Sequence, residues 1–358
     1  MNPRIRQTVE QLTAYTPGEQ PQVPGLIKLN TNENPYPPSP AVTEVLRTVA
    51  AESLRLYPDP VCSALRVRIA SLYGCALDQV FVGNGSDEVL RLCTRAFTQP
   101  GGTVASFAPS YSLYPVLAAA EEVGFWEVPL PDDFSWVAPP GDLAATLFWV
   151  ANPNAPTGVF YPVEAIREFS ERFTGVVAVD EAYVDFAGGR DCLTLARELP
   201  NVLVCRTLSK SFSLAGLRLG FALGAPELIA ALYKLKDSYN VDRLAQLIAL
   251  AALNDVQWMQ ANARRIVATR ERVTAALQQR GFYVVPSAAN FLFAQPPAGL
   301  PAEQLFAALR QKNILIRYFP GARTGRFLRI SIGTDAEMDA LLTALSEIPV
   351  DGSAGKRV

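Results

Sequence analysis

The sequence predicts an α/β protein with a mostly parallel central sheet flanked by helices, plus a smaller α+β domain. The first observation is a set of short apolar runs, at 143–149, 176–179 and 202–205, each leading into polar residues. Runs of this kind are typical of strands buried in a parallel sheet. The second observation is a C-terminal part in which short strand patterns surround one helical pattern, at 302–312. A chain of 358 residues is long enough for two domains.

Local signals define the elements of the first hundred residues. Ser39 is a good N-cap, so a helix is expected from there to about residue 51. Segment 30–38 is too rich in proline and asparagine for a helix and is predicted to be an extended loop. Further helices are expected at 4–13, 62–73 and 87–97, with a strand at 80–82.

The middle of the chain alternates strand and helix patterns. Strands are expected at 103–107, 122–129, 143–149, 176–179, 202–205 and 221–224, and helices at 227–237, 244–253 and 256–279. The last helix is long and amphipathic, and we expect it to link the two domains. Its arginines are predicted to form a solvated face: Arg264, Arg265, Arg270 and Arg272.

The C-terminal part is predicted to add strands at 282–285, 289–293, 314–317 and 326–333 around the helix at 302–312. Alternation in the last strand places Phe327, Arg329 and Ser331 on one face. An arginine inside such a strand usually needs an anionic partner. The polar tail, 351–358, is predicted to be disordered.

Composition excludes several classes of function. A net charge of −2 gives no reason to expect nucleic acid or an acidic membrane surface as a partner, and no apolar run reaches the length of a membrane span. The five scattered cysteines are typical of reduced thiols in a cytoplasmic protein. Because histidine is absent, histidine triads and histidine metal sites are excluded. No metal site is predicted, and lysine is the leading acid/base candidate.

Three predicted strand ends carry a lysine, an acid and an amide. Lys210 follows the strand at 202–205, Asp180 ends the strand at 176–179, and Asn154 lies in the turn after the strand at 143–149. An amine at that edge can condense with an aldehyde, while Ser209 and Arg218 can hold a phosphate. Asp180 can pair with a protonated ring nitrogen, and Tyr183 can bond a ring hydroxyl. This set matches pyridoxal 5′-phosphate (PLP). The alternative is a loop of polar residues at a strand end.

A glycine turn at 83–85 opens the helix at 87–97 and presents free backbone amides to an anion. Gly85, Ser86 and Asp87 are therefore predicted to cradle the cofactor phosphate. The competing interpretation is a dinucleotide fold with a nicotinamide-dependent oxidoreductase activity. Its glycine pattern would need a glycine where Glu88 stands, so it is disfavoured.

The ordered motifs resemble those of the aspartate-aminotransferase superfamily of PLP enzymes. They are Asn-Pro-Asn-Ala-Pro-Thr-Gly at 152–158, Asp-Glu-Ala-Tyr at 180–183 and Thr-Leu-Ser-Lys-Ser-Phe-Ser-Leu-Ala-Gly-Leu-Arg at 207–218. Within this superfamily, the chain is most similar to the histidinol-phosphate aminotransferases, and the resemblance extends from about residue 5 to about residue 345. The resemblance implies the PLP-dependent transferase fold, with a large PLP-binding domain at 30–255 and a small domain from 1–29 and 256–350. It also implies transamination of L-histidinol phosphate with 2-oxoglutarate, giving imidazole-acetol phosphate and L-glutamate, in histidine biosynthesis.

The resemblance assigns further roles. Tyr111, which could otherwise be a core aromatic, would stack on the pyridine ring. Tyr57, which could simply pack on prolines, would reach the partner's cofactor phosphate across a homodimer interface with shared active sites. Substrate contacts would come from Tyr15, Asn32, Asn34, Arg317 and Arg329. Arg317 could equally be an exposed strand-end residue, and Arg323 and Arg326 stand close enough to leave that assignment open.

Three alternatives remain from the sequence. An aromatic-amino-acid aminotransferase or a threonine-phosphate decarboxylase would share the cofactor residues on the same scaffold. A non-enzymatic PLP-binding regulator would need a DNA-binding module, and no basic N-terminal domain precedes the motifs that begin near residue 30. The nicotinamide-dependent enzyme is the third.

Overall fold

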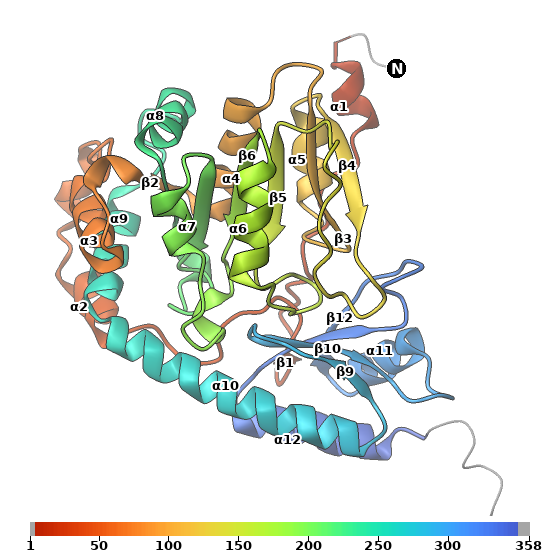
Figure 1. The fold of residues 1–358 in the computed structure, drawn as a ribbon. Helices are drawn as coiled ribbons and strands as arrows, with labels where there is room; N and C mark the ends of the chain where they lie inside the picture. Colours follow the sequence, from red (N-terminus) through yellow and green to blue (C-terminus); the bar gives the residue numbers. More distant parts are fainter. Residues whose placement is uncertain (1–3, 350–358) are drawn as a thin grey trace, which may run out of the picture.

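A computed structural model describes residues 4–349, so the predicted disordered tail at 351–358 lies outside the described residues. Its centre is a seven-stranded sheet in the order β2-β8-β7-β6-β5-β3-β4 (Figure 1). The strands are β2 (Val80–Gly83), β3 (Thr103–Ala108), β4 (Gly124–Pro129), β5 (Leu147–Ala151), β6 (Val176–Asp180), β7 (Val202–Thr207) and β8 (Gly220–Gly224). Only β8 runs antiparallel to its neighbours. The predicted α/β class with a mostly parallel sheet is confirmed.

Both faces of this sheet are covered, which explains why its inner strands are apolar throughout. Phe148 and Val150 pack with Phe169 on one face, while Trp149 packs with Tyr114 on the other. The helices around the sheet are α2 (Pro40–Thr48), α3 (Ser63–Tyr73), α4 (Gly85–Phe97), α5 (Tyr114–Ala120), α6 (Val163–Arg172), α7 (Leu193–Glu198), α8 (Pro226–Leu235) and α9 (Arg243–Asn254), with the short α1 (Gln7–Gln11) before them. Single 3₁₀ turns lie at Ala51–Arg55, Leu77–Gln79, Val184–Phe186 and Ala215–Leu217.

The C-terminal lobe is built on a four-stranded antiparallel sheet in the order β12-β13-β10-β9. Its elements are β9 (Tyr283–Val285), β10 (Phe291–Gln295), α11 (Ala302–Gln311), β11 (Ile314–Leu315), β12 (Arg317–Tyr318), β13 (Leu328–Ser331) and α12 (Asp335–Glu347). The N-terminal strand β1 (Ile27–Lys28) pairs parallel with β11, so the start of the chain joins this lobe. The long α10 (Val256–Gln279) runs from the end of α9 to lie beside α12 (Figure 1).

The predicted solvated arginine face on α10 is wrong at one position. Arg264, Arg265 and Arg272 are exposed, but Arg270 is buried. Its guanidinium donates to the main-chain oxygens of Phe186 and Ala289, 3.2 and 2.9 Å away, so it ties the helix to both lobes. Buried arginine is tolerated here because these carbonyls and the carboxylate of Glu271, 2.9 Å from Nη2, satisfy it.

Other departures from the predicted elements are small. Helices α5, α6, α7 and α12 were not assigned from the sequence. The strand predicted at 314–317 divides into β11 and β12, which pair with different sheets. Among residues 4–349, no helix combines the length and the hydropathy that a bilayer crossing would require.

Candidate active site

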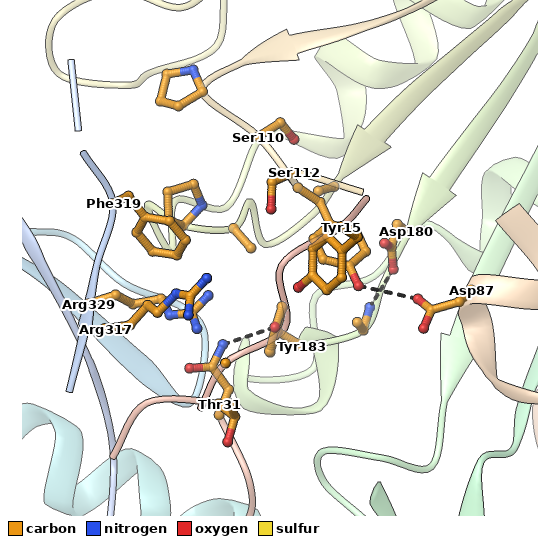
Figure 2. A pocket seen from close by; sticks show the side chains of 18 of the residues that line it. Tyr15, Thr31, Asp87, Ser110, Ser112, Asp180, Tyr183, Arg317, Phe319 and Arg329 are labelled. Carbon is orange, nitrogen blue, oxygen red and sulfur yellow. Dashed lines mark hydrogen bonds between the residues drawn. The ribbon is translucent and has the colours of Figure 1, made fainter. Parts of the chain in front are cut away.

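A cavity of about 560 Å³ lies at the carboxyl edge of the large sheet, where the polar strand ends meet the small lobe. Its lining comes from the N-terminal segment, from the ends of β5, β6 and β7, and from β12 and β13. Figure 2 shows Asp180 and Tyr183 on the large-sheet side, facing Arg317 and Arg329 on the small-lobe side. Ligands of open α/β sheets bind at this edge.

Lys210 reaches the cavity from the loop that follows β7. Its Nζ donates to the main-chain oxygen of Thr31, 3.1 Å away, and lies 5.8 Å from the centre of the Tyr183 ring. Burial, followed by the positive charge of Arg329, lowers the pKa of this amine to about 8. A lysine with that pKa has a neutral, nucleophilic fraction at physiological pH.

Asp180 ends β6 and is almost fully buried. Its Oδ1 accepts from the Ala182 amide and its Oδ2 from the Tyr114 hydroxyl, each at 3.2 Å. Burial raises the pKa of this carboxyl to about 6, against the opposing effect of these two hydrogen bonds. Asp180 is therefore mostly charged at neutral pH and can pair with one cationic ring nitrogen.

Tyr183 stands beside Asp180 in the cavity wall. Its hydroxyl accepts from Nδ2 of Asn32 at 3.0 Å, and burial raises its pKa. Asn32 in turn is held by Ser331 of β13, whose Oγ accepts from the main-chain N–H of Asn32 at 2.9 Å and donates to its Oδ1 at 2.9 Å. One predicted cofactor residue, Tyr183, and one predicted substrate residue, Asn32, are therefore hydrogen-bonded to each other.

A cationic cradle lies at the N-terminus of α4. Arg218 donates to Oδ2 of Asp87 at 3.1 Å and to Oγ of Ser209 at 3.4 Å. Gly85 has φ +80°, and a Cβ there would lie 2.7 Å from the Arg218 guanidinium. Arginine, hydroxyl and free helix amides are the donor set that a phosphate requires.

Tyr111 forms an aromatic wall over this cradle. Its hydroxyl donates to Oδ1 of Asp87 at 3.3 Å, and burial raises its pKa strongly. Tyr15, from the N-terminal segment, meets Tyr111 edge-on at 6.1 Å between ring centres. Both rings line the cavity, as predicted for ligand-contacting aromatics.

Two guanidinium groups converge on the small-lobe side of the cavity (Figure 2). Arg329 donates to the main-chain oxygen of Asn30 at 2.8 Å, and its buried Nε has no partner among the described residues. Arg317 donates to the main-chain oxygen of Thr16 at 3.2 Å. Neither forms an ion pair within residues 4–349, and burial lowers the pKa of Arg329. The pair presents unneutralised positive charge to the cavity, which suits an anionic ligand.

The nearby arginines have other partners. Arg323 donates to the main-chain oxygens of Ala108 and Pro131, at 3.2 and 2.6 Å. Arg326 is exposed and does not line the cavity. The geometry therefore favours Arg317 over both for a ligand contact.

Four predicted site residues lie outside the cavity lining: Gly85, whose place beside Arg218 is described above, Asn34, Asn154 and Tyr57. Both Nδ2 hydrogens of Asn154 are engaged, by the Pro109 carbonyl at 3.1 Å and by Thr157 Oγ1 at 2.9 Å. Asn34 donates to the main-chain oxygens of Lys210 and Ser211, at 3.2 and 3.0 Å. In this structure, the side chains of Asn154 and Asn34 each hold a loop in place.

Tyr57 is also outside the cavity. Its side chain is 76% exposed and stacks on Tyr239 with 4.3 Å between ring centres. Its predicted role depends on a partner subunit, so a single chain leaves that role untested.

Sequence reasoning missed several lining residues and one supporting residue. Thr31, Ser110, Ser112 and Phe319 line the cavity without belonging to a recognised motif. Tyr114 supports Asp180 from α5, an element that the sequence had not revealed. A tyrosine three residues after Tyr111 was the only available signal for it.

Comparisons with known proteins agree with this geometry. A sequence profile of the family "Aminotransferase class I and II" matches residues 24–345. Histidinol-phosphate aminotransferase 1 of Bordetella parapertussis is 48% identical over 95% of this chain and 97% of its own length. The histidinol-phosphate aminotransferase of Chromohalobacter salexigens is 47% identical with the same coverage.

A solved structure points the same way. The histidinol-phosphate aminotransferase of Sinorhizobium meliloti, determined in complex with pyridoxal 5′-phosphate, superposes with a TM-score of 0.87. It is 28% identical, and the match covers 96% of this chain and 97% of that one. The cavity at the sheet edge, the ordered motifs and these matches together show that the chain belongs to the class I and II aminotransferase family.

Proposed function

We propose that this protein is a PLP-dependent aminotransferase that moves the amino group of L-histidinol phosphate to a 2-oxo acid, 2-oxoglutarate, in histidine biosynthesis. The observation that carries the proposal is the pair Arg317 and Arg329, which lines the same cavity as Lys210 and has no acidic partner among the described residues. Two guanidinium groups suit a phosphate dianion. The names of the most similar relatives support the same substrate.

The residues at the sheet edge fit PLP. The glycine cradle at Gly85, beside Arg218 and Ser209, leaves room and donors for a phosphate. Asp180 would supply the acid for the ring nitrogen, Tyr183 would bond the ring hydroxyl, and Tyr111 would offer a face to the ring; all three line the cavity. Asn154 can bond the cofactor only after its Nδ2 gives up the hydrogen bond to Thr157 Oγ1. Ser86 and Asp87 line the cavity beside them.

The chain's own groups divide the work. When bound, PLP supplies an aldehyde that condenses with amines and a ring that accepts electrons from the substrate carbon. Lys210 would hold that aldehyde in the resting enzyme, and once the substrate amine has displaced Nζ, the freed neutral amine would take the proton from the substrate carbon that carries the amino group. Asp180, in its charged form, would keep the proton on the ring nitrogen. Arg317 and Arg329, with Tyr15 beside them, orient the substrate by its phosphate, and Asn32 keeps Tyr183 in place.

An exposed apolar surface supports a homodimer with shared active sites. It lies on α2, α3, α9 and the segments that flank them. Its side chains are each at least 37% exposed: Leu46, Leu54, Leu56, Tyr57, Val61, Val67, Tyr239, Leu247 and Trp258. A patch of this extent usually marks a protein interface. Tyr57, the most exposed of these side chains, would reach the cofactor phosphate of the partner.

The cellular setting is part of the proposal. All five cysteines are free thiols, four of them buried. Unpaired cysteines in this number suit a reducing compartment, which supports the cytoplasm. The net charge of −2 gives no support for nucleic acid or an anionic membrane as a partner.

The test is a titration of the PLP-loaded protein, followed by its visible absorption band. L-Histidinol phosphate should convert the band, and 2-oxoglutarate should restore it. Arg329→Lys should raise the KM for L-histidinol phosphate about tenfold or more, because lysine lacks the bidentate geometry. Arg326→Lys is the matched control, since Arg326 is exposed and outside the cavity.

Other outcomes would point to other functions. Conversion by phenylalanine alone would identify an aromatic-amino-acid aminotransferase, in which Arg329 binds a carboxylate. Release of carbon dioxide from threonine phosphate would identify a decarboxylase. A protein that stays colourless with PLP, or binds it without converting any amine, would contradict the enzyme proposal.

A further inference from the structure

Tyr114 is a buried tyrosine whose hydroxyl points at the acid of the site. It begins α5 and is fully buried, and its hydroxyl donates to Oδ2 of Asp180 at 3.2 Å. Its ring stacks on Trp149 with 4.9 Å between centres and meets Tyr111 edge-on at 5.5 Å. These contacts fix the ring on two sides, so the hydroxyl position is determined by packing.

The hydrogen bond completes the support of the Asp180 carboxylate. The Ala182 amide holds Oδ1, and Tyr114 holds Oδ2. With one donor on each oxygen, the carboxyl plane is fixed, and remaining lone pairs face the cavity that Asp180 lines. Tyr114 itself does not line that cavity, so it acts through Asp180.

Burial works against the charge on Asp180. Other groups that influence it lie on every side: Asp87 of α4, Lys210 after β7, Cys205 of β7, and the hydroxyls of Tyr111 and Tyr183. Asp87 disfavours the charged form, whereas Lys210 favours it. Tyr114 and the Ala182 amide are the two groups that donate hydrogen bonds to it among the described residues. Hydrogen bonds to a charged acceptor stabilise the charged form.

We propose that Tyr114 is a positioning residue that keeps Asp180 ionised and aimed at the ring nitrogen of the cofactor. The inference rests on the proposed PLP cofactor and adds to it a residue that never touches PLP. A purely structural role as a core aromatic would require only the ring. The hydroxyl is therefore the group to test.

The chain contains a matched control. Tyr161 is also fully buried, but its hydroxyl has no hydrogen-bond partner among the described residues. Tyr161→Phe and Tyr114→Phe remove the same atom from equally buried sites. Only the second removes a donor from Asp180.

The experiment measures the affinity of the cofactor-free protein for two probes. One is PLP, and the other is its analogue with CH in place of the ring nitrogen. Tyr114→Phe should weaken PLP binding about tenfold, the usual effect of losing a hydrogen bond to a charged group. Affinity for the analogue should be unchanged, because the analogue cannot pair with Asp180. Tyr161→Phe should change neither affinity.

The pH dependence gives a second readout. The preference for PLP over the analogue should develop as Asp180 ionises with rising pH. In Tyr114→Phe this midpoint should move to higher pH by about one unit, because the charged form has lost a donor. Titration of Lys210 should change the affinities for PLP and for the analogue equally, because both carry the aldehyde. The ratio of the two affinities therefore reports only the interaction of Asp180 with the ring nitrogen.

Two results would overturn the inference alone: equal loss of affinity for both probes, or no loss for either. Equal loss would mean that Tyr114 acts only through packing. A wild-type protein that fails to bind PLP would overturn the proposed function, and this inference with it.

Discussion

Burial of the Asp180 carboxylate opposes folding whenever that group is charged. Its folded-state pKa of about 6 lies above the ordinary 3.8. Such a group favours folding at low pH, and its contribution is lost as pH rises through about 6. The shift corresponds to roughly 3 kcal/mol. The negative charge on Asp180 that the proposed cofactor needs therefore lowers the free energy of unfolding of the cofactor-free protein.

The substitution Asp180→Asn tests this at the residue scale. An amide resembles the protonated acid, so the cofactor-free variant should gain stability over the wild type by up to roughly 3 kcal/mol at pH 8 and by about half of that at pH 5. Urea unfolding at the two pH values measures the difference. A gain that is the same at both would show that Asp180 is not the titrating group. PLP affinity should fall in the same variant.

Single residues differ in how far the sequence reveals them. Lys210 and Asp180 were predicted because each follows an apolar run, and parallel strands bring their ends to one edge. Tyr114 and the inward-turned amide of Asn154 could not be predicted, since their partners are set by how loops and α5 pack. Arg270 was misassigned because a helical pattern does not reveal carbonyls that arrive from other elements.

At the scale of elements, β8 lies directly against the start of α4. A Cβ at Gly220 would lie 2.5 Å from the amide nitrogen of Ser86 and 2.7 Å from the carbonyl carbon of Gly85. These are backbone atoms that cannot move aside. The contact fixes the phosphate cradle to the sheet.

Gly220→Ala should therefore destabilise the protein by about 1–3 kcal/mol and weaken PLP binding, because the helix start must shift. Gly141→Ala is the control, since nothing lies within 4 Å of a Cβ there. Urea unfolding and PLP titration of both variants measure the effects. Unchanged PLP affinity in Gly220→Ala would mean that the cradle position does not depend on this contact.

The elements themselves were largely predictable. Strands β2, β3, β6 and β7 begin at the predicted residues and end close to them, and α10 has the predicted bounds. These segments have long, uninterrupted patterns. Short elements were not predictable in this way. Helix α7 has too few residues for a clear pattern, and the division into β11 and β12 depends on their pairing with different sheets, which a local pattern does not reveal.

At the scale of the whole molecule, a shared active site makes a quantitative prediction. Lys210→Ala retains Tyr57, whereas Tyr57→Ala retains Lys210. If each subunit lends its Tyr57 to the partner's site, a mixed dimer contains one complete site. Co-expression should restore about a quarter of wild-type activity by random pairing in a two-fold dimer.

Each variant expressed alone is the control, and Lys210→Ala should be inactive. Activity of the co-expressed pair equal to the average of the two separate proteins would mean that Tyr57 serves its own subunit. The sequence could suggest this role only by resemblance, because an interface leaves no periodic pattern in one chain.

The pairing of β1 with β11 has a consequence for synthesis of the protein. The bond from Asn32 to Ser331 joins positions 299 residues apart. The strands that carry Lys210 and Asp180 leave the ribosome well before β12 and β13, which carry Arg317 and Arg329. A growing chain can therefore assemble the edge that would hold the cofactor while the two arginines that would bind the substrate phosphate have yet to be translated.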